Sequence, residues 1–293
     1  MFEYLQMNHT LDRLAEVFRD IDGHKQSSKI IRTYSYNKQD IREVALNGID
    51  FKNVKQVIDI GCGFGFFSEA FCKRGEAGTI ISGIDCFEEY RDVYLQMCLK
   101  CGSEAKFYNN GHNALSTFKP NSVNLVLCSF SLYFFPSVLP QLCRILKESG
   151  ISIFITHSES HLKELTQLVL EIIHSNGFPE INILPHDELI KKFSGENGEM
   201  QLLKYFDKVE RRNYFNELVF TNRSIGEFIH YFRYKKSFFF PTELLSDYNL
   251  ITEVENELIS YVNKHKKIRI SKNDVIFICS KPNLHNSSID ESY

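Results

Sequence analysis

The sequence lacks long apolar runs and any excess of basic residues. No uninterrupted apolar segment approaches the roughly 18 residues that a membrane-spanning helix requires. The N-terminal residues carry neither the basic region nor the small-residue cleavage site of a secretory signal. With 34 Lys and Arg against 37 Asp and Glu, the formal net charge is −3, whereas proteins that mainly bind phosphate backbones concentrate basic residues. We therefore expect a cytoplasmic protein with no membrane segment and no DNA partner.

The composition also excludes a disordered chain. Tryptophan is absent, but 25 Phe and 14 Tyr bring the aromatic share to 13%, and 43% of the residues are hydrophobic. Cys128 and Cys279 fall inside apolar segments of strand length, where cysteine behaves as a small hydrophobe in a reducing compartment. Cys98 and Cys101 have C-x-x-C spacing, but no second pair stands at metal-site spacing. We expect neither disulfides nor a metal site.

Strand and helix signals alternate through the first half of the chain. Four apolar runs have strand length, at 57–60, 79–84, 123–129 and 151–156. Segments with helical spacing lie between them and end near glycines, at 66–74, 88–101 and 137–147. Because the runs are continuously apolar instead of alternating, the strands should be buried on both faces. The expected fold is α/β, with a doubly wound, mostly parallel sheet.

Beyond residue 180 the pattern changes to a polar loop, a strand-like stretch at 207–220 and aromatic-rich helical residues. We expect an N-terminal helical extension (1–53), a core (54–180), a cap insertion on the substrate side (181–267), a return strand of the core (268–280) and a flexible tail (281–293). The aromatic residues between Tyr231 and Phe240 either line an acceptor pocket or form core, since aromatic stripes at helical spacing serve both purposes.

A glycine-rich loop follows the first expected strand, in the segment VIDIGCGFGFFSEAF. Gly61, Gly63 and Gly65 allow a sharp turn and close approach of a ligand, and the helix that follows presents free N–H groups. The dinucleotide pattern G-x-G-x-x-G would need a small residue where Phe66 stands, so a pyrophosphate site is disfavoured. No Gly-Lys-Ser/Thr follows the loop, which excludes a P-loop.

The pattern D-x-G-x-G-x-G, which starts at Asp59, resembles the first motif of class I S-adenosylmethionine-dependent methyltransferases. The second expected strand ends in Asp85, twenty positions beyond Gly65, where the family places an acid on the ribose hydroxyls. The resemblance implies a Rossmann-like sheet of seven strands and S-adenosyl-L-methionine as the cofactor. Two simpler interpretations stay open: Asp85 could interact with the start of the next helix, and the glycines could form a plain tight turn.

The resemblance covers residues 54–156 and continues in HNALSTFKPNSVNLVLCSFSLYFFP, which is similar to the third and fourth motifs of the family. Asn113 stands where an Asp usually contacts the adenine, and Asn124 replaces the Asp that commonly opens the fourth strand. An amide oxygen can still accept from the adenine amino group. The cofactor-binding residues that the resemblance implies are Asp59, Gly61, Cys62, Gly63, Gly65, Asp85, Cys86, Asn113 and Ser129.

Methyl transfer is an in-line displacement, so the protein mainly aligns the reacting groups, and a general base helps if the acceptor is a hydroxyl or a protonated amine. His157 directly follows the fifth strand, at the edge where open α/β sheets bind ligands. Tyr133, just after the fourth strand, could orient an acceptor. The alternatives are that His157 only bonds backbone groups and that Tyr133 only packs.

We expect an enzyme that methylates a small molecule on oxygen or nitrogen. An RNA or protein methyltransferase is the second possibility, although it would favour a basic groove that the near-neutral composition does not indicate. The third is a cofactor-binding regulator without catalysis, which the departures at Asn113 and Asn124 would suit.

Overall fold

The computed structural model describes residues 13–76 and 78–283, which form two compact units. The helical unit consists of residues 13–38, 158–192 and 215–273. The sheet unit consists of residues 39–157, 193–214 and 274–283. The chain therefore passes from one unit to the other five times.

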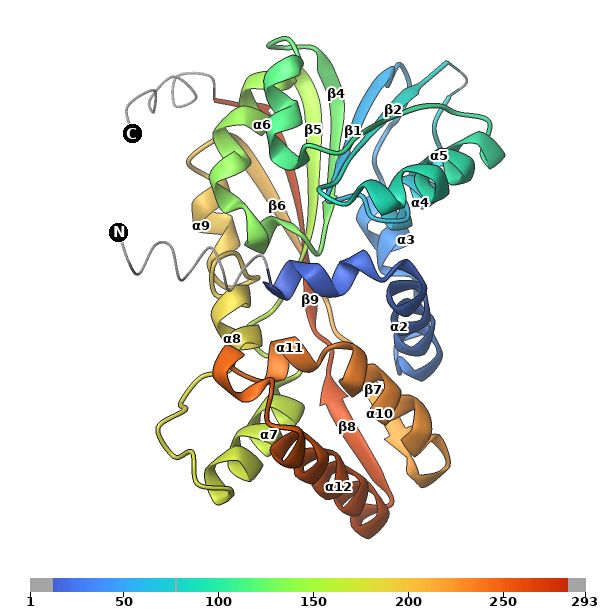
Figure 1. The fold of residues 1–293 in the computed structure, drawn as a ribbon. Helices are drawn as coiled ribbons and strands as arrows, with labels where there is room; N and C mark the ends of the chain where they lie inside the picture. Colours follow the sequence, from blue (N-terminus) through green and yellow to red (C-terminus); the bar gives the residue numbers. More distant parts are fainter. Residues whose placement is uncertain (1–12, 77, 284–293) are drawn as a thin grey trace. The chain divides into compact units, whose positions relative to one another are not determined.

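The sheet unit is built on seven strands in the order β3-β2-β1-β4-β5-β9-β6 (Figure 1). The strands are β1 (Gln56–Ile60), β2 (Ile80–Ile84), β3 (Glu104–Tyr108), β4 (Val123–Ser129), β5 (Leu146–His157), β6 (Phe206–Tyr214) and β9 (Asp274–Pro282). Neighbours pair in parallel from β3 to β5, and β9 runs antiparallel to both β5 and β6. The expected mostly parallel sheet is confirmed. Its central strands β1 and β4 are almost wholly buried, which explains their continuous apolar runs.

Helices connect the strands of the sheet unit. They are α3 (Ile41–Leu46), α4 (Phe66–Cys72), α5 (Arg91–Lys100), α6 (Leu139–Ile145) and α9 (Gly198–Leu202), with the short 3-10 turns η2 (Glu88–Tyr90), η3 (Gly111–Thr117), η4 (Leu132–Phe134) and η5 (Pro136–Val138). The α4 helix follows β1, and it packs beside α5, which follows β2 (Figure 1). The glycine loop thus lies between the central strand and α4, as its sequence predicts.

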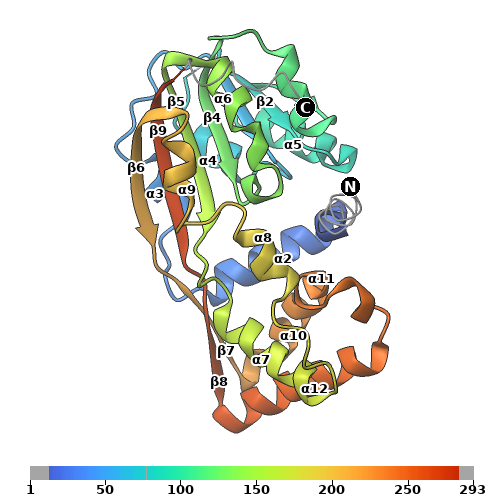
Figure 2. The ribbon, with the colours of Figure 1, turned by 90° about the vertical axis from the view of Figure 1, so that its left-hand side faces the viewer.

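The helical unit contains most of the remaining helices and a two-stranded antiparallel sheet (Figure 2). Its elements are η1 (Val17–Arg19), α2 (Ile21–Tyr34), α7 (Lys163–Ser175), α8 (Pro185–Ile190), β7 (Glu217–Thr221), η6 (Asn222–Ser224), α10 (Ile225–Tyr234), α11 (Lys236–Phe239), η7 (Thr242–Leu244), α12 (Tyr248–His265) and β8 (Lys267–Ser271). Tyr231, Phe232, Phe239 and Phe240 are fully buried in its hydrophobic core. Of the two interpretations of this aromatic segment, the structure therefore supports core.

The structure divides the chain differently from the expected linear segments. Residues 206–214, expected in the cap, form the edge strand β6 of the main sheet, where a partly solvated position tolerates their polar residues. Residues 158–180, expected in the core, belong to the helical unit, because the apolar stripe of α7 packs against α12 and β8. The expected return strand is two strands, β8 and β9, in different sheets. Residues 281 and 282, expected in the tail, end β9, and residues 284–293 lie outside the described residues.

Among the described residues, no helix combines the length and the apolar character needed to cross a membrane.

Candidate functional site

All three glycines of the loop after β1 adopt left-handed backbone conformations, with φ values of +67° at Gly61, +48° at Gly63 and +89° at Gly65. Residues with a Cβ rarely occupy this region. At Gly61 the space is also restricted, because an added Cβ would lie 2.4 Å from both Cβ and Oγ of Ser131. The glycines are therefore required by both the turn and the packing beside it.

Asp85 ties the glycine loop to the end of β2. Its Oδ2 accepts a hydrogen bond from the Gly63 N–H at 2.8 Å, and its Oδ1 accepts one from the Phe87 N–H at 3.1 Å. Burial raises the pKa of Asp85, and these backbone donors oppose the rise without cancelling it. The backbone N–H and the thiol of Cys86 also favour the charged form of this carboxylate, so it lies among several donors. If Asp85 interacted only with the start of the next helix, its bond to the Phe87 N–H would be explained, but its bond to the Gly63 N–H would not.

Asp59 lies beneath the loop and holds the start of α4. Its Oδ2 accepts from the N–H of Ser68 at 3.2 Å and from the Ser68 hydroxyl at 2.6 Å. The Ser68 hydroxyl also lies 3.0 Å from the Tyr94 hydroxyl. Asp59 is 1% exposed, and burial raises its pKa to about 7. The Asp59 side chain therefore hydrogen-bonds to α4, and it supports the glycine loop through this helix.

The remaining expected cofactor residues fall on neighbouring strand ends with different exposures. The Cys62 side chain is buried, and an added Cβ at Gly83 would lie 2.9 Å from its Sγ, so only the backbone of Cys62 is placed for a ligand. Cys86 and Asn113 are exposed, and Ser129 is half-buried at the end of β4. The Gly111 N–H donates to the Asp85 carbonyl at 3.2 Å, which brings the turn that contains Asn113 beside the end of β2.

His157, the last residue of β5, is paired with a carboxylate. Its Nδ1 lies 2.6 Å from Oδ1 of Asp274, and the two side chains are only 10% and 3% exposed. The pairing follows from the sheet register, because His157 and Asp274 are direct partners across the antiparallel strands β5 and β9. Since the carboxylate accepts from Nδ1–H, Nε2 is the nitrogen that can accept a proton. The alternative in which His157 bonds only backbone groups does not describe this side chain.

Two aromatic rings fix the plane of the His157 imidazole. Phe130 stacks on it with a centroid distance of 4.8 Å and an interplanar angle of 23°, and Tyr133 does so at 5.6 Å and 22°. Phe130 has a φ of +55°, which is a strained conformation for a residue with a side chain. Its ring also lies 6.4 Å from the ring of Phe66, the first residue of α4. The rings therefore connect the glycine loop with the His157–Asp274 pair.

Sequence reasoning missed Asp274. In the sequence, Asp274 is marked only as an acid directly before the apolar run of the last strand. That it faces His157 becomes evident only from the antiparallel pairing of β9 with β5. Tyr214 of β6 is the partner of Asp274 on its other side, and burial, with the charge of Asp274 as a smaller cause, raises the pKa of Tyr214 to about 12.

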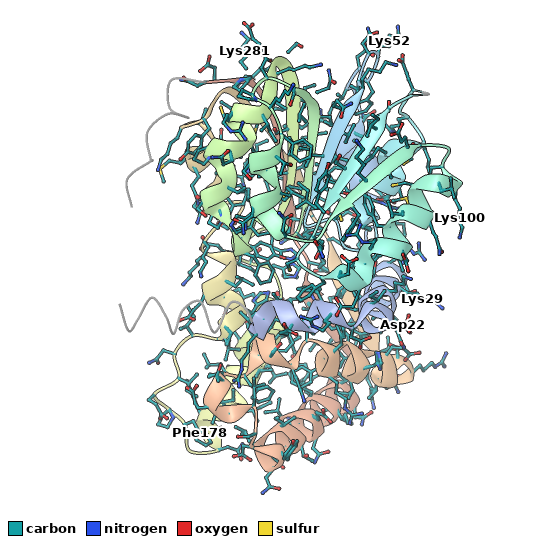
Figure 3. All side chains as sticks on the ribbon, turned by 45° about the horizontal axis from the view of Figure 1, so that its top comes forward. Asp22, Lys29, Lys52, Lys100, Phe178 and Lys281 are labelled. Carbon is teal, nitrogen blue, oxygen red and sulfur yellow. The ribbon has the colours of Figure 1, made fainter. Side chains whose placement is uncertain are left out.

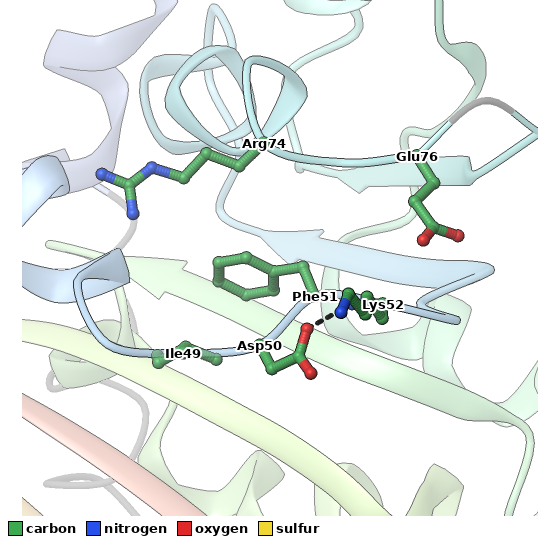
Figure 4. A pocket seen from close by; sticks show the side chains of 6 residues that line it. All are labelled: Ile49, Asp50, Phe51, Lys52, Arg74 and Glu76. Carbon is green, nitrogen blue, oxygen red and sulfur yellow. Dashed lines mark hydrogen bonds between the residues drawn. The ribbon is translucent and has the colours of Figure 1, made fainter.

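A surface hollow of about 350 Å³ lies elsewhere in the sheet unit (Figure 4). It is lined by residues 49–52, Arg74 and Glu76, which precede β1 and follow α4. Figure 3 shows Lys52 of this loop at the same end of the sheet unit as Lys281 of β9, which is the end where the parallel strands begin. Ligands of open α/β sheets bind at the opposite, carboxyl ends of the strands, where the glycine loop, Asp85 and His157 lie. We therefore do not assign this hollow to the site.

Comparison with known proteins agrees with this geometry. A family model described as a methyltransferase domain matches residues 57–150. A ubiquinone biosynthesis O-methyltransferase of Shewanella sp. (strain ANA-3) is 24% identical over 183 residues, which cover 61% of this chain and 73% of that protein. The protein of the same name from Nitrosomonas europaea is 31% identical over 105 residues, which cover 35% of this chain and 43% of its own length. Three more relatives of that name are covered over 50% to 58% of their length.

Two solved structures share the fold. A protein from Bacillus halodurans C-125, described as a candidate methyltransferase, superposes with a TM-score of 0.53 at 12% identity, covering 83% of this chain and 99% of that one. The YcgJ protein of Bacillus subtilis superposes with a TM-score of 0.51 at 14% identity, and the match covers 89% of this chain and 100% of that protein. At these identities the likeness concerns the fold.

Proposed function

We propose that this chain is a class I S-adenosylmethionine-dependent methyltransferase and that it transfers the methyl group of that cofactor to a hydroxyl oxygen of a small molecule. The observation that carries the choice of a hydroxyl is the buried His157–Asp274 pair at the carboxyl end of β5. A hydroxyl must lose its proton as it is methylated, and a histidine oriented by a carboxylate is suited to take it.

The residues around the glycine loop fit the cofactor. In this proposal the Asp85 carboxylate, which lies beside the glycine loop, accepts hydrogen bonds from the ribose hydroxyls of the cofactor. The proposal also assigns to the adenosine site the backbone of the glycine loop, with the exposed residues Asn113 and Cys86 and the half-buried Ser129 as its border; the loop residues are Gly61, Cys62, Gly63 and Gly65. When bound, the cofactor supplies an electrophilic methyl group on its sulfonium. Asp59 contributes by holding α4 and not by contact with the ligand.

In the proposed reaction, Nε2 of His157 takes the proton from the acceptor hydroxyl as the oxygen attacks. Asp274 holds the imidazole in the required tautomer and stabilises the imidazolium that forms. Phe130 and Tyr133 keep the ring in its plane, so Tyr133 is a positioning residue in this proposal. The rest of the rate enhancement comes from alignment of the reacting groups.

The proposal is tested by transfer of labelled methyl from S-adenosylmethionine into a metabolite extract. His157→Ala should lower the initial rate by about 100-fold to 10,000-fold, the range usual for loss of a general base. Asp274→Asn should lower the rate as well, while both variants keep their affinity for S-adenosylhomocysteine. His265→Ala is the matched control, because His265 is exposed at the end of α12, where its ring lies 4.4 Å from that of Tyr261.

Two results would contradict the proposal. An unchanged rate in His157→Ala would remove the general base. Tight binding of S-adenosylhomocysteine without transfer of label to any small molecule would favour the alternatives, which are an RNA or protein acceptor or a regulator without catalysis.

A further inference from the structure

Three side chains lie in a row across neighbouring strands of the sheet unit. His157 is the direct partner of Asp274 across β5 and β9, and Tyr214 is its direct partner across β6 and β9. Direct partners in antiparallel strands project to the same face of a sheet, with Cβ atoms about 4.5–5.5 Å apart. All three residues are buried. The Asp274 carboxylate therefore has the imidazole of His157 on one side and the phenol ring of Tyr214 on the other.

The Tyr214 hydroxyl does not compete with His157 for the Asp274 carboxylate. A phenol has one proton to donate, and Tyr214 donates it to the backbone carbonyl of Gln39. Oδ1 of Asp274 lies 2.6 Å from Nδ1 of His157. Burial raises the pKa of Tyr214 to about 12, with the charges of Asp274 and Asp40 as smaller causes, so the phenol stays protonated at neutral pH. Tyr214 is therefore not a second base, and its ring is what it presents to Asp274.

These residues stand where the segments of the sheet unit begin or end. Gln39 and Asp274 are the first residues of their segments, and His157 and Tyr214 are the last residues of theirs. A strand end has ladder hydrogen bonds on one side only, so it is held less firmly than the middle of the strand. The bond from Tyr214 to Gln39 joins two such ends that are 175 positions apart in the chain. It therefore holds the ring of Tyr214 where the ladder gives least support.

The Gln39 carbonyl belongs to a segment that β6 also holds at other points. Nη1 of Arg212, two positions before Tyr214, donates to the carbonyl of Val44 at 2.8 Å and to that of Asn47 at 2.9 Å. Both carbonyls lie at α3, the first helix of this segment. The hydroxyl of Tyr214 is thus bonded to a part of the chain that is itself fixed to the edge strand.

We propose that Tyr214 is a positioning residue for the general base, because its ring keeps water away from the side of Asp274 that faces away from His157. The inference rests on the role proposed for His157. A carboxylate shielded from water stabilises an imidazolium more strongly than a solvated one, since the two charges interact in a medium of lower dielectric constant. Tyr214 thereby makes His157 a stronger base without contact with the substrate.

The experiment measures His157 directly and needs no methyl acceptor. The full chain is labelled with nitrogen-15 histidine and titrated by NMR, and the signal that is absent from His157→Ala belongs to His157. Tyr214→Leu should lower the midpoint of this titration by about one pH unit, because water then reaches Asp274. Tyr214→Phe keeps the ring and loses only the bond to Gln39, so it should lower the midpoint by a smaller, measurable amount.

Phe206→Leu is the matched control. Phe206 is fully buried at the other end of β6, where it pairs with Pro282. Both leucine variants remove an aromatic ring from the same strand, so both should lower the free energy of unfolding, but only Tyr214→Leu should move the midpoint of His157. An equal shift in the two leucine variants would overturn the inference, as would an unchanged midpoint in Tyr214→Phe, which is the milder change if Tyr214→Leu does not fold.

The transfer of labelled methyl into a metabolite extract separates this inference from the proposed function. At saturating S-adenosylmethionine, Tyr214→Leu should lower the rate by about tenfold to a hundredfold, with an unchanged KM for S-adenosylmethionine. An unchanged rate in His157→Ala would overturn the general base, and the inference with it. A slow His157→Ala together with a wild-type rate and midpoint in Tyr214→Leu would overturn the role of Tyr214 alone.

Discussion

Gly61→Ala tests whether the glycine loop is formed as described. Gly61 has a φ of +67°, and a left-handed conformation costs a residue with a Cβ about 1–2 kcal/mol. The new Cβ would also lie 2.4 Å from Cβ and Oγ of Ser131, and overpacking of this kind costs about 1–3 kcal/mol. The free energy of unfolding should therefore fall by about 2–5 kcal/mol, with a weaker affinity for S-adenosylhomocysteine because the loop must shift.

Two variants separate the steric cost from the backbone cost. Gly48 has a φ of +73°, and an added Cβ would meet no atom within 4 Å, so Gly48→Ala should show the backbone cost alone. Ser131→Gly removes both atoms that the new methyl group would touch, so it should be less damaging on the Gly61→Ala background than on the wild type. Denaturant unfolding is measured for the wild type, the three single variants and the double variant. Equal losses in Gly61→Ala and Gly48→Ala, with additive effects of Ser131→Gly, would refute the packing argument.

Two further predictions concern the acids of the site. Asp85→Ala should weaken binding of S-adenosylhomocysteine by on the order of 2–4 kcal/mol in calorimetric titration, because two charge-assisted bonds to the ribose are lost; a large loss of stability with unchanged affinity would leave only its bonds to Gly63 and Phe87. Burial raises the pKa of Asp59 to about 7, so the folded state holds its proton more tightly than the unfolded chain, where the pKa is about 3.9. The free energy of unfolding of the wild type relative to that of Asp59→Asn should therefore decrease as the pH rises from about 4 to about 7, and then level off. A difference in this free energy that stays constant across that range would contradict the raised pKa of the buried carboxyl.

The central sheet and the glycine loop could be predicted from the amino-acid sequence. Strands β1 and β4 are buried on both faces, so their apolar runs follow directly from their position. The left-handed turn after β1 requires glycine at several positions, which leaves a pattern visible in any sequence that forms it. Local signals of this kind need no knowledge of distant residues.

Edge strands left much weaker signals. Residues 104–108 form β3, yet only Phe107 of this strand is buried, so no apolar run marks it. The strand β6 likewise has a mixed pattern, and its place beside β9 depends on pairing with residues 274–282. The hydrophobic pattern of an edge strand depends more on its exposure to solvent than on the strand with which it pairs.

Contacts between side chains from distant parts of the chain depend on the three-dimensional fold. His157 and Asp274 are 117 positions apart, and their contact exists because β9 runs antiparallel to β5 in one particular register. The Ser103 hydroxyl donates to Sγ of Cys72 at 3.6 Å because α4 packs beside α5, although nothing local in the sequence links these two residues. Pairings between distant residues are set by register and packing, which depend on the whole fold and leave no local pattern in the chain.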